Sequence, residues 1–479
     1  MSIPHFPLMV PDTRETGQFE VVAPYDLSPI ATVGTADSTA VATALDTAHA
    51  LFRNRDAWLS PARRIEILDR AATIMAERAE HLAVEAAREG GKPLLDSRVE
   101  VARAIDGVKI CIETLRTDGG EEIPMGVNAA SQNRLAFTHR EPIGIVVAVS
   151  AFNHPLNLIV HQVGPAIATG CPVIVKPAHD TPLSCMRFVQ ILREAGLPDE
   201  WCQAMAIEDL DVATQLITDE RVGFFSFIGS AKVGWMLRSK LAAGTRCALE
   251  HGGPAPVIVA ADADIKQTAA ILAKGGFYHA GQVCVSVQRI FAHASIAENL
   301  AHAIAAVGES MKVGDPTQED TDIGPFIRPK ELQRVHEWVL EAISGGAQCL
   351  SGGEPVSDTC YPATTLLHPA SDSKVSTLEI FGPVVAVTEY TDIDNAIETA
   401  NSLPFAFQAA VYTRDLDLAM KVYRRLDASA VMINDFTAFR VDWMPFAGLR
   451  QSGMGVGGIP HTMRDMQIEK LMVIKSDEL

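Results

Sequence analysis

Three strand-like apolar runs, each followed by a helical segment, restrict the fold of this chain more than any other feature. The runs lie at 143–149, 172–175 and 224–228, and the second and third are followed by helices that begin near Thr181 and Ser230. Runs without polar alternation are typical of strands that are buried on both faces of a parallel sheet and joined by crossover helices. We therefore predict an α/β fold with a Rossmann-like nucleotide domain.

A second series of the same kind follows in the next part of the chain. A strand is predicted at 256–260, a helix around 267–275 and a further strand at 285–292. The chain has 479 residues, which is too long for one hydrophobic core. The second series therefore predicts a second α/β domain.

Two further patterns flank these series. One long helix is predicted from Ser60 to Gly90, because Ser can cap free amide groups, Pro61 fits the first turn and Gly suits the end of a helix. The polar, strand-like segment 121–140 predicts a projecting hairpin, and 470–475 predicts a strand that pairs with a neighbour. Both strand segments would suit oligomerisation.

Charge and composition exclude several classes of protein. The formal net charge of −19 argues against nucleic acid or an anionic membrane as a partner, because such binding needs clustered Lys and Arg. The best apolar run, Ile143–Phe152, is far too short to span a membrane, and the start of the chain lacks a secretory signal. The eight cysteines show no spacing typical of metal ligands. We expect a cytoplasmic protein without a metal site.

Seven short motifs stand in a fixed order along nearly the whole chain. They are Phe152-Asn153-His154-Pro155, Val175-Lys176-Pro177-Ala178, Phe227-Ile228-Gly229-Ser230, Leu249-Glu250-His251-Gly252-Gly253, Gly281-Gln282-Val283-Cys284, Glu379-Ile380-Phe381-Gly382-Pro383 and Pro445-Phe446-Ala447-Gly448, the last leading to Ser452-Gly453. Each motif is weak alone, but seven in order make coincidence implausible. Through them the chain resembles the aldehyde dehydrogenase superfamily.

The resemblance implies a catalytic role for three residues. Cys284 matches the nucleophile, since a thiolate can attack an aldehyde to give a thiohemiacetal that loses hydride and becomes a thioester. Glu250 matches the general base that activates water for hydrolysis of the thioester. Asn153 offers an amide donor that would stabilise the tetrahedral oxyanion together with the backbone N–H of Cys284.

The same resemblance implies a nicotinamide cofactor and residues that hold it. Lys176 matches a lysine that binds the adenosine ribose, and Glu379 matches a residue that binds the nicotinamide ribose, with Phe381 packing nearby. Gly229 and Ser230 open a predicted helix, whose free amide groups and dipole favour phosphate. A Gly-Ser pair is also a common simple helix cap, so this pair carries little weight alone.

One cofactor position departs from the family pattern. His179 stands where members that prefer NAD often have Glu, whose carboxylate binds the free ribose hydroxyl and repels a 2′-phosphate. Because that carboxylate is absent, binding of NADP is also possible. We expect NAD as the main cofactor and NADP as a possible one.

The substrate class follows from a narrower resemblance. Phe152 to Asn157, together with Phe439 to Asp442 and Met444-Pro445, is similar to a subgroup that includes lactaldehyde, sulfolactaldehyde and phosphonoacetaldehyde dehydrogenases. This resemblance implies a small, polar or anionic aldehyde. Arg103 and Arg440 are candidates for binding its anionic group, because a guanidinium can hold a carboxylate, sulfonate or phosphonate by two parallel hydrogen bonds. The alternative is that both make ordinary salt bridges.

The resemblance also implies a division of the chain and an assembly. The cofactor-binding domain would comprise 1–120 and 141–249, the catalytic domain 250–455, and a small β oligomerisation arm 121–140 and 456–479. We expect a homodimer or a homotetramer.

Two rival functions remain open. A cofactor-independent thiol hydrolase would also use Cys284, but it would have no use for Lys176, Ser230 and Glu379. A CoA-acylating aldehyde dehydrogenase would pass the thioester to coenzyme A instead of water, and the presence of Glu250 favours hydrolysis.

Overall fold

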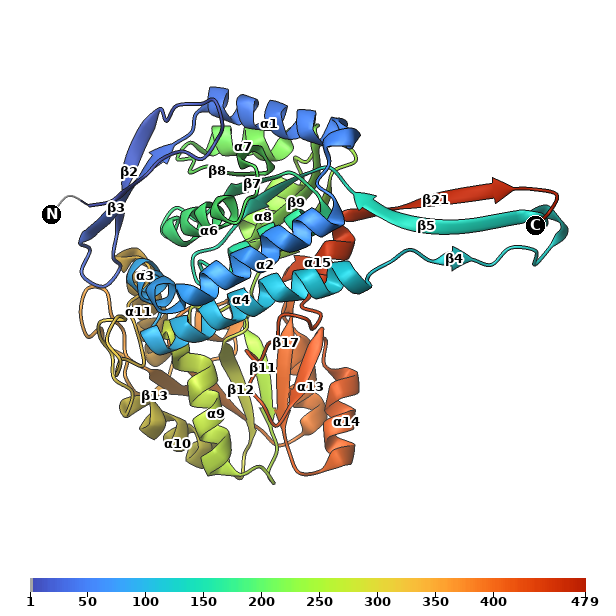
Figure 1. The fold of residues 1–479 in the computed structure, drawn as a ribbon. Coiled ribbons are helices and arrows are strands. Elements are labelled where there is room, and N and C mark those ends of the chain that lie inside the picture. The colour runs from blue at the N-terminus through green and yellow to red at the C-terminus, as the bar shows by residue number, and fades with distance from the viewer. Residues whose placement is uncertain (1–2) are drawn as a thin grey trace.

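Two open sheets and a projecting arm make up the fold of the computed structural model, which describes residues 3–479. In the view of Figure 1 one sheet lies in the upper half, the other in the lower half, and the arm extends to the right. The first sheet has the strand order β20 (Gly453–Met454), β10 (Arg246–Glu250), β9 (Val222–Ile228), β6 (Ile145–Val149), β7 (Val173–Lys176) and β8 (Cys202–Ala204). All of these strands are parallel except β20.

The three predicted strands of the first sheet are confirmed as β6, β7 and β9, and both faces of the sheet are buried. Along β6, Val146 and Ala148 pack into one apolar cluster, whereas Ile145 and Val147 pack into another. Alternate side chains point to opposite faces of a strand, so apolar residues at every position require a cover on both sides.

Helices provide that cover. On one face lie α2 (Pro61–Glu77), α4 (Leu94–Thr117), α5 (Asn157–Thr169), α6 (Leu183–Glu194) and α15 (Ile459–Asp465). On the other face lie α1 (Ser38–Arg53), α7 (Leu210–Thr218) and α8 (Ala231–Arg238). This half also contains the small sheet of β1 (His5–Phe6), β2 (Gly17–Val22) and β3 (Pro29–Thr35).

The predicted helix from Ser60 to Gly90 is two helices, α2 and α3 (Ala79–Gly90), so the prediction of one helix was wrong. Its ends are confirmed, because Ser60 caps the amide of Arg63 and Gly91 ends α3 in the left-handed conformation at φ 74°. The break is at Arg78, whose ψ of 13° leaves the helical range. No Gly or Pro marks this position, so the sequence pattern contains no signal for the break.

The second sheet confirms the second predicted series, with strands at β11 and β12 and the helix at α9 (Ile265–Phe277). Its strand order is β13 (Gln348–Ser351), β14 (Thr364–Leu367), β15 (Val384–Tyr390), β12 (Val287–His293), β11 (Ala255–Val259), β17 (Gln408–Tyr412) and β18 (Ala430–Ile433). Only β13 is antiparallel to its neighbour.

Helices cover this sheet on both faces as well. One face carries α9 and α10 (Ala297–Glu309), and the other carries α13 (Ile393–Asn401) and α14 (Leu416–Arg425). Further elements are α11 (Pro329–Ser344), α12 (Lys374–Thr377), β16 (Phe405–Ala406) and β19 (Leu449–Arg450).

The arm consists of β4 (Glu122–Ile123), β5 (Arg134–Pro142) and β21 (Gln467–Lys475). The predicted hairpin region therefore does project, but β21 pairs with β5 of its own chain, from Gln467 opposite Pro142 to Lys475 opposite Arg134. Helix α15, which falls within the range predicted for the arm, packs with Ile459 and Met463 into the core of the first half.

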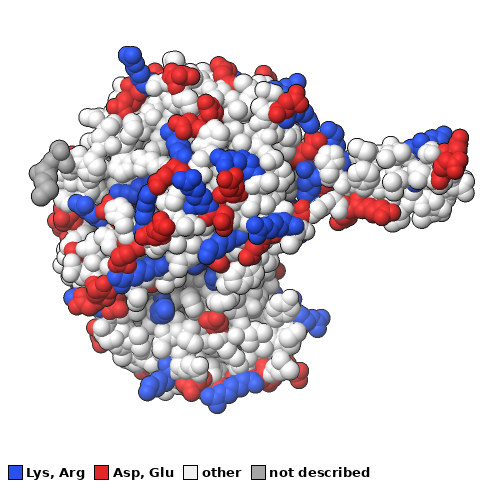
Figure 2. Space-filling view, viewed as in Figure 1, with Lys and Arg blue, Asp and Glu red and all other residues white. Residues whose placement is uncertain are grey.

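None of the helices within residues 3–479 is long and apolar enough to cross a membrane. Figure 2 shows basic and acidic side chains interspersed over the visible face of the molecule.

Candidate active site

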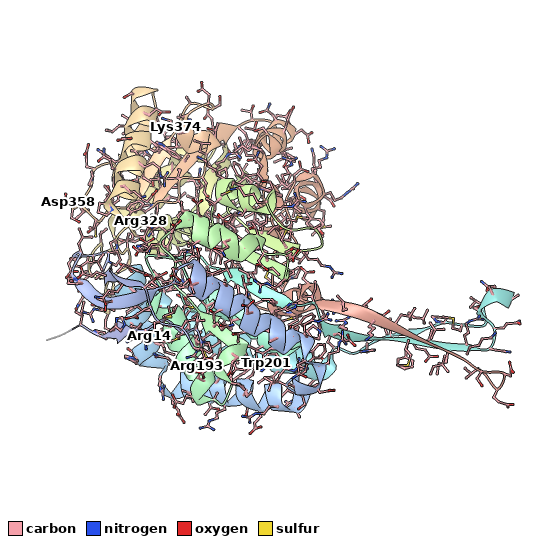
Figure 3. All side chains as sticks on the ribbon, turned by 90° about the horizontal axis from the view of Figure 1, so that it is seen from above. Arg14, Arg193, Trp201, Arg328, Asp358 and Lys374 are labelled. Carbon is pink, nitrogen blue, oxygen red and sulfur yellow. The ribbon has the colours of Figure 1, made fainter. Side chains whose placement is uncertain are left out.

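The predicted site residues meet in a cleft between the two halves, where β6, β7, β9 and β10 end and where β11 and β12 begin. A cavity of about 920 Å³ lies in this cleft. Open parallel sheets bind ligands beyond the carboxyl ends of their strands, so the first sheet presents its binding edge to the cavity. At the rim, Arg328, labelled in Figure 3, donates two hydrogen bonds of 2.6 Å to Asp180 of the other half.

Every predicted site residue except Lys176 lines this cavity. Those that line it are Cys284, Glu250, Asn153, His179, Gly229, Ser230, Glu379, Phe381, Arg103 and Arg440. Lys176 lies at the end of β7, and its ammonium group makes one long hydrogen bond of 3.4 Å, to the carbonyl of Pro177.

Cys284 follows a tightly constrained turn. His279 and Ala280 are buried and have φ values of 51° and 52°, in the left-handed region that costs energy for any residue with a Cβ. Gly281 has φ 65°, and a Cβ there would lie 2.0 Å from the carbonyl oxygen of Gly382. The chain can therefore pass this point only with Gly, and the turn presents Cys284 to the cavity.

Two opposing effects act on the Cys284 thiol. Burial raises its pKa to about 12, while the positive charge of Arg440 acts in the opposite direction.

Glu250, at the end of β10, also has a raised pKa because of burial, and the charge of Arg440 again opposes the shift. A carboxylate of raised pKa suits a general base. The carboxylate has room because Gly457 has no side chain, whose Cβ would lie 2.4 Å from Glu250 Oε1.

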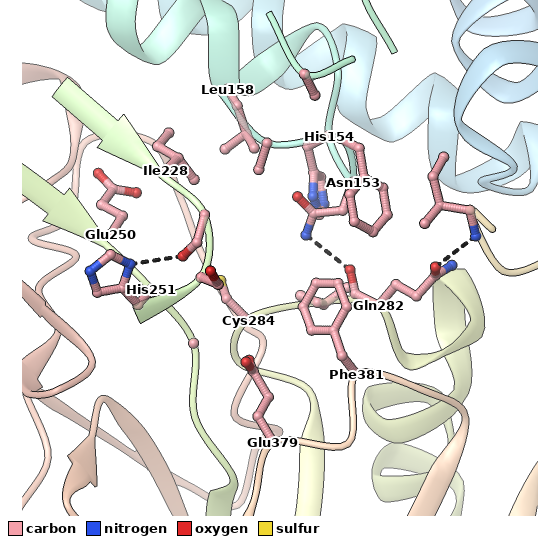
Figure 4. A pocket seen from close by; sticks show the side chains of 18 of the residues that line it. Asn153, His154, Leu158, Ile228, Glu250, His251, Gln282, Cys284, Glu379 and Phe381 are labelled. Atoms are coloured by element: carbon pink, nitrogen blue, oxygen red, sulfur yellow. Dashed lines mark hydrogen bonds between the residues drawn. The ribbon is translucent and has the colours of Figure 1, made fainter. Parts of the chain in front are cut away.

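Asn153 approaches the nucleophile from the opposite half of the molecule. Its amide Nδ2–H donates to the backbone carbonyl of Gln282 over 2.9 Å, as the dashed line in Figure 4 shows. Gln282 is fixed in turn, because its Oε1 accepts from the amide of Ile327 at 3.0 Å and its Nε2 donates to the carbonyl of Pro325. The side-chain amide of Asn153 is therefore fixed against the backbone two residues before Cys284.

Glu379 also lines the cavity, and its buried Oε1 has no hydrogen-bond partner within residues 3–479. Burial raises the pKa of this carboxyl to about 7. An unpaired buried oxygen is costly, and a hydroxyl group of a bound ligand would satisfy it. The residues present therefore fit a ribose at this point.

The cavity lining also includes a helix N-terminus with free amides and a histidine in an aromatic stack. Ser230 precedes α8 and makes no side-chain cap, so the first amides of the helix stay free. His179 stacks on Phe19 with ring centroids 4.2 Å apart.

The two predicted substrate arginines differ in their surroundings. Arg103 donates from Nε and Nη2 to the carboxylate of Asp442 over 3.1 and 2.6 Å. Arg440 is close to His161, at 3.3 Å from Nη2 to Nδ1, and its guanidinium lies 3.6 Å from the ring centroid of Phe446. No carboxylate within residues 3–479 lies within 4.0 Å of the Arg440 guanidinium nitrogens. Arg440 thus has no carboxylate partner among the described residues, while Arg103 forms an ion pair with Asp442.

Asp442 connects Arg103 and His161 beside Arg440. Burial alone would raise the pKa of Asp442, but hydrogen bonds from His161 and Arg103 hold it well below its usual range. The distance between His161 Nε2 and Asp442 Oδ1 is 2.7 Å.

Several residues that support the site were missed by the sequence analysis. Glu100, buried on α4, accepts from the amides of Leu156 and Asn157 at 2.9 and 3.0 Å and forms a buried ion pair with Lys92. This carboxylate anchors the backbone just after Asn153. Asp442, His161 and His251 were missed in the same way, because each acts through partners far away in the sequence.

Comparisons with known proteins agree with this geometry. The sequence profile of the aldehyde dehydrogenase family matches residues 10–472. The 3-sulfolactaldehyde dehydrogenase of Priestia aryabhattai is 37% identical over 458 residues, which are 95% of each chain. A structure of aldehyde dehydrogenase 21 from Physcomitrella patens in complex with the product succinate has a TM-score of 0.95 at 31% identity and covers 99% of both chains.

A further structure carries a cofactor. It is the glyceraldehyde-3-phosphate dehydrogenase GapN of Methanocaldococcus jannaschii complexed with NADP, with a TM-score of 0.91 at 34% identity, covering 97% of this chain and all of that one. The chain belongs to the aldehyde dehydrogenase family. The predicted enzyme class, fold and resemblance to the sulfolactaldehyde dehydrogenase subgroup are confirmed.

The raised pKa of Cys284 leads to a first prediction. Below a pKa of about 12 the thiolate fraction rises tenfold with each pH unit, and only the thiolate is alkylated at an appreciable rate. We expect the rate of iodoacetamide labelling of Cys284 in the cofactor-free protein to rise about tenfold per unit from about pH 7 to 9. Peptide mass spectrometry measures this rate, with Cys284→Ser as the control. A plateau below about pH 9 would contradict the prediction.

Proposed function

We propose that this protein oxidises a small, polar or anionic aldehyde to its carboxylic acid with NAD, and that NADP also serves. The observation that carries the proposal is the convergence of Cys284, Glu250 and the unpaired oxygen of Glu379 on one cavity. A thiol, a half-buried carboxylate of raised pKa and a ribose acceptor are what oxidation through a thioester requires.

In the first half of the reaction the Cys284 sulfur, as thiolate, bonds to the aldehyde carbon, and the carbonyl oxygen becomes an oxyanion. The Asn153 amide, now donating to Gln282 O, and the backbone N–H of Cys284 would donate to that oxygen. Donors of this kind contribute roughly 2.7–4 kcal/mol each. As the oxyanion re-forms the carbonyl of the thioester, it expels the hydride from the carbon, and a bound nicotinamide would accept it.

In the second half Glu250 takes a proton from a water molecule as the water oxygen attacks the thioester carbon. The carbon–sulfur bond breaks, Cys284 leaves as thiolate and the carboxylic acid departs. Glu250 must be ionised to do this, and the Arg440 charge favours the ionised form against the effect of burial. The presence of this base supports transfer to water rather than to coenzyme A.

The cofactor would lie along the edge of the first sheet. Lys176 and Glu379 would bind its two riboses, with Phe381 beside the nicotinamide, and the free amides at Ser230 would receive a phosphate. His179 carries no negative charge that would repel a 2′-phosphate. The nearby Asp180 is neutralised by its ion pair with Arg328.

For the substrate, the contrast between the two arginines supports Arg440 as the residue that binds an anionic group. Arg103 is held by Asp442, so we assign it a supporting role: it keeps the Asp442 carboxylate in place beside His161. The half-buried Arg440 guanidinium, which has no carboxylate partner among the described residues, has the greater need of an anion.

The arm, here limited to β4, β5 and β21 because α15 packs into the first half, is proposed to serve oligomerisation to a homodimer or homotetramer. Strand β21 supports this role, since it is an edge strand whose Leu471, Met472, Val473 and Ile474 are all exposed.

The proposed division of labour between Cys284 and Glu250 is tested by transient kinetics. In Glu250→Gln, hydride transfer needs no water, so reduced cofactor should form in a burst of about one equivalent per site, followed by turnover lowered at least about 100-fold. Stopped-flow absorbance measures both phases. Cys284→Ala should give neither burst nor turnover. A Glu250→Gln enzyme without a burst, or with normal turnover, would show that Glu250 is not the base for hydrolysis.

The anion site is tested by comparing two aldehydes in each variant. Because hydrogen bonds to charged groups are worth about 1.5–3 kcal/mol, Arg440→Ala should lower kcat/KM for a carboxylated or sulfonated aldehyde at least about tenfold more than for neutral lactaldehyde. The ratio of kcat/KM for the anionic aldehyde to kcat/KM for lactaldehyde does not depend on the effect of Arg440 on Cys284 and Glu250, because that effect is common to both substrates. Arg440→Lys is the control that keeps the charge. An equal fall for both aldehydes would exclude Arg440 from binding the anion.

A further inference from the structure

His251 links the residue proposed as base to the turn proposed to bind the cofactor phosphate. Its Nδ1–H donates to the backbone carbonyl of Gly229 over 2.7 Å, as Figure 4 shows. The amide of Gly229 donates in turn to the backbone carbonyl of Glu250 over 3.1 Å. Gly229 is therefore held on both sides by the dipeptide Glu250-His251.

The surroundings of the ring show that packing alone does not account for an imidazole here. His251 is 1% exposed, and its Nε2 has no hydrogen-bond partner within residues 3–479. Burial lowers the pKa of the ring, which keeps it neutral. A buried polar atom without a partner costs free energy, so an apolar side chain would fill this space at lower cost. What the imidazole adds is the hydrogen bond to Gly229.

Helix α8 is adapted to this ring. A Cβ at Gly234 would lie 2.1 Å from Cε1 of His251, so the ring can reach Gly229 only because position 234 has no side chain. Phe227 and Trp235 pack around the same ring, with centroids at 5.7 and 6.1 Å.

The geometry of the peptide group gives the hydrogen bond its consequence. In a planar trans peptide the carbonyl of Gly229 and the N–H of Ser230 point in opposite directions. Fixing the carbonyl toward His251 therefore directs the Ser230 N–H away from it, at the start of α8 where the free amides favour an anion. If this peptide rotated, a carbonyl oxygen would replace the amide and repel a phosphate.

We propose that His251 is a positioning residue for the cofactor: its Nδ1–H fixes the peptide between Gly229 and Ser230 so that the amide of Ser230 is available to a cofactor phosphate. The inference rests on the proposed function for the identity of the ligand. His251 lines the same cavity as Glu250, but its imidazole is directed to the carbonyl of Gly229, so its loss should weaken cofactor binding more than it slows the chemical step.

The test uses two replacements that differ in one hydrogen bond. In His251→Asn the amide nitrogen takes approximately the place of Nδ1 and keeps the donor, whereas His251→Leu fills the space without one. For Leu we expect the Kd for NADH and the KM for NAD to rise about tenfold, equivalent to about 1.4 kcal/mol. The value of kcat and the KM for aldehyde at saturating NAD should stay within about twofold, and Asn should match the wild type within about twofold.

A second variant guards against a folding defect at His251. Gly234→Ala favours the helix intrinsically, but its methyl group would push the ring from Gly229. We expect the same rise in Kd as for His251→Leu, in a protein that still unfolds cooperatively in a thermal melt. In the double variant Gly234→Ala with His251→Ala, the methyl group at 234 should change the Kd less than about twofold relative to His251→Ala, because the space of the ring is then empty.

Fluorescence titration with NADH measures binding without turnover, so the two proposals can fail separately. If the wild type binds NADH and His251→Leu binds it within about twofold as tightly, His251 has no positioning role. If His251→Asn and His251→Leu weaken NADH binding equally, the positioning role is likewise wrong and His251 acts through packing. A wild type that binds NADH but gives no NAD-dependent oxidation of any aldehyde would overturn the proposed function alone. A wild type that binds neither cofactor would overturn both.

Discussion

The hydrogen bond between the Asn153 side chain and the Gln282 carbonyl is the contact on which the arrangement of the site depends. It is 2.9 Å long and joins the two halves of the molecule directly beside Cys284. Its two partners are anchored independently, Gln282 through Ile327 and Asn153 through the backbone that Glu100 holds. Neither half contains a complete site, so the distance between oxyanion donor and nucleophile is set where the two halves meet.

Unpaired charge in a buried cavity is the second feature of the site. Glu250 and Glu379 are half-buried carboxyls with raised pKa values, and Arg440 is a half-buried guanidinium without a carboxylate partner among the described residues. Such groups destabilise the folded protein. Their clustering on one cavity marks a functional site, because bound ligands and reacting groups would supply the missing partners. Arg103 shows the contrast, since its charge is already neutralised by Asp442.

The sequence predicted the parallel strands well, because residues buried on both faces of a strand, such as Ile145 to Val149, leave an uninterrupted apolar run. Most site residues were predictable because they stand in short motifs. The break at Arg78 left no signal, since no residue there is incompatible with a helix. The ion pair of Arg103 with Asp442 joins residues 339 positions apart, so only the folded structure shows which arginine remains free.

A thioester on Cys284 is the intermediate that the proposed reaction requires, and it can be trapped chemically. The Glu250→Gln enzyme would be mixed with NAD and an aldehyde substrate, quenched in acid, digested and analysed by mass spectrometry. The account predicts that the peptide containing Cys284 gains the mass of the acyl group, one per site, and that hydroxylamine removes it. An enzyme that produces NADH while the Cys284 peptide stays unmodified, or an acyl group on another cysteine, would contradict the account.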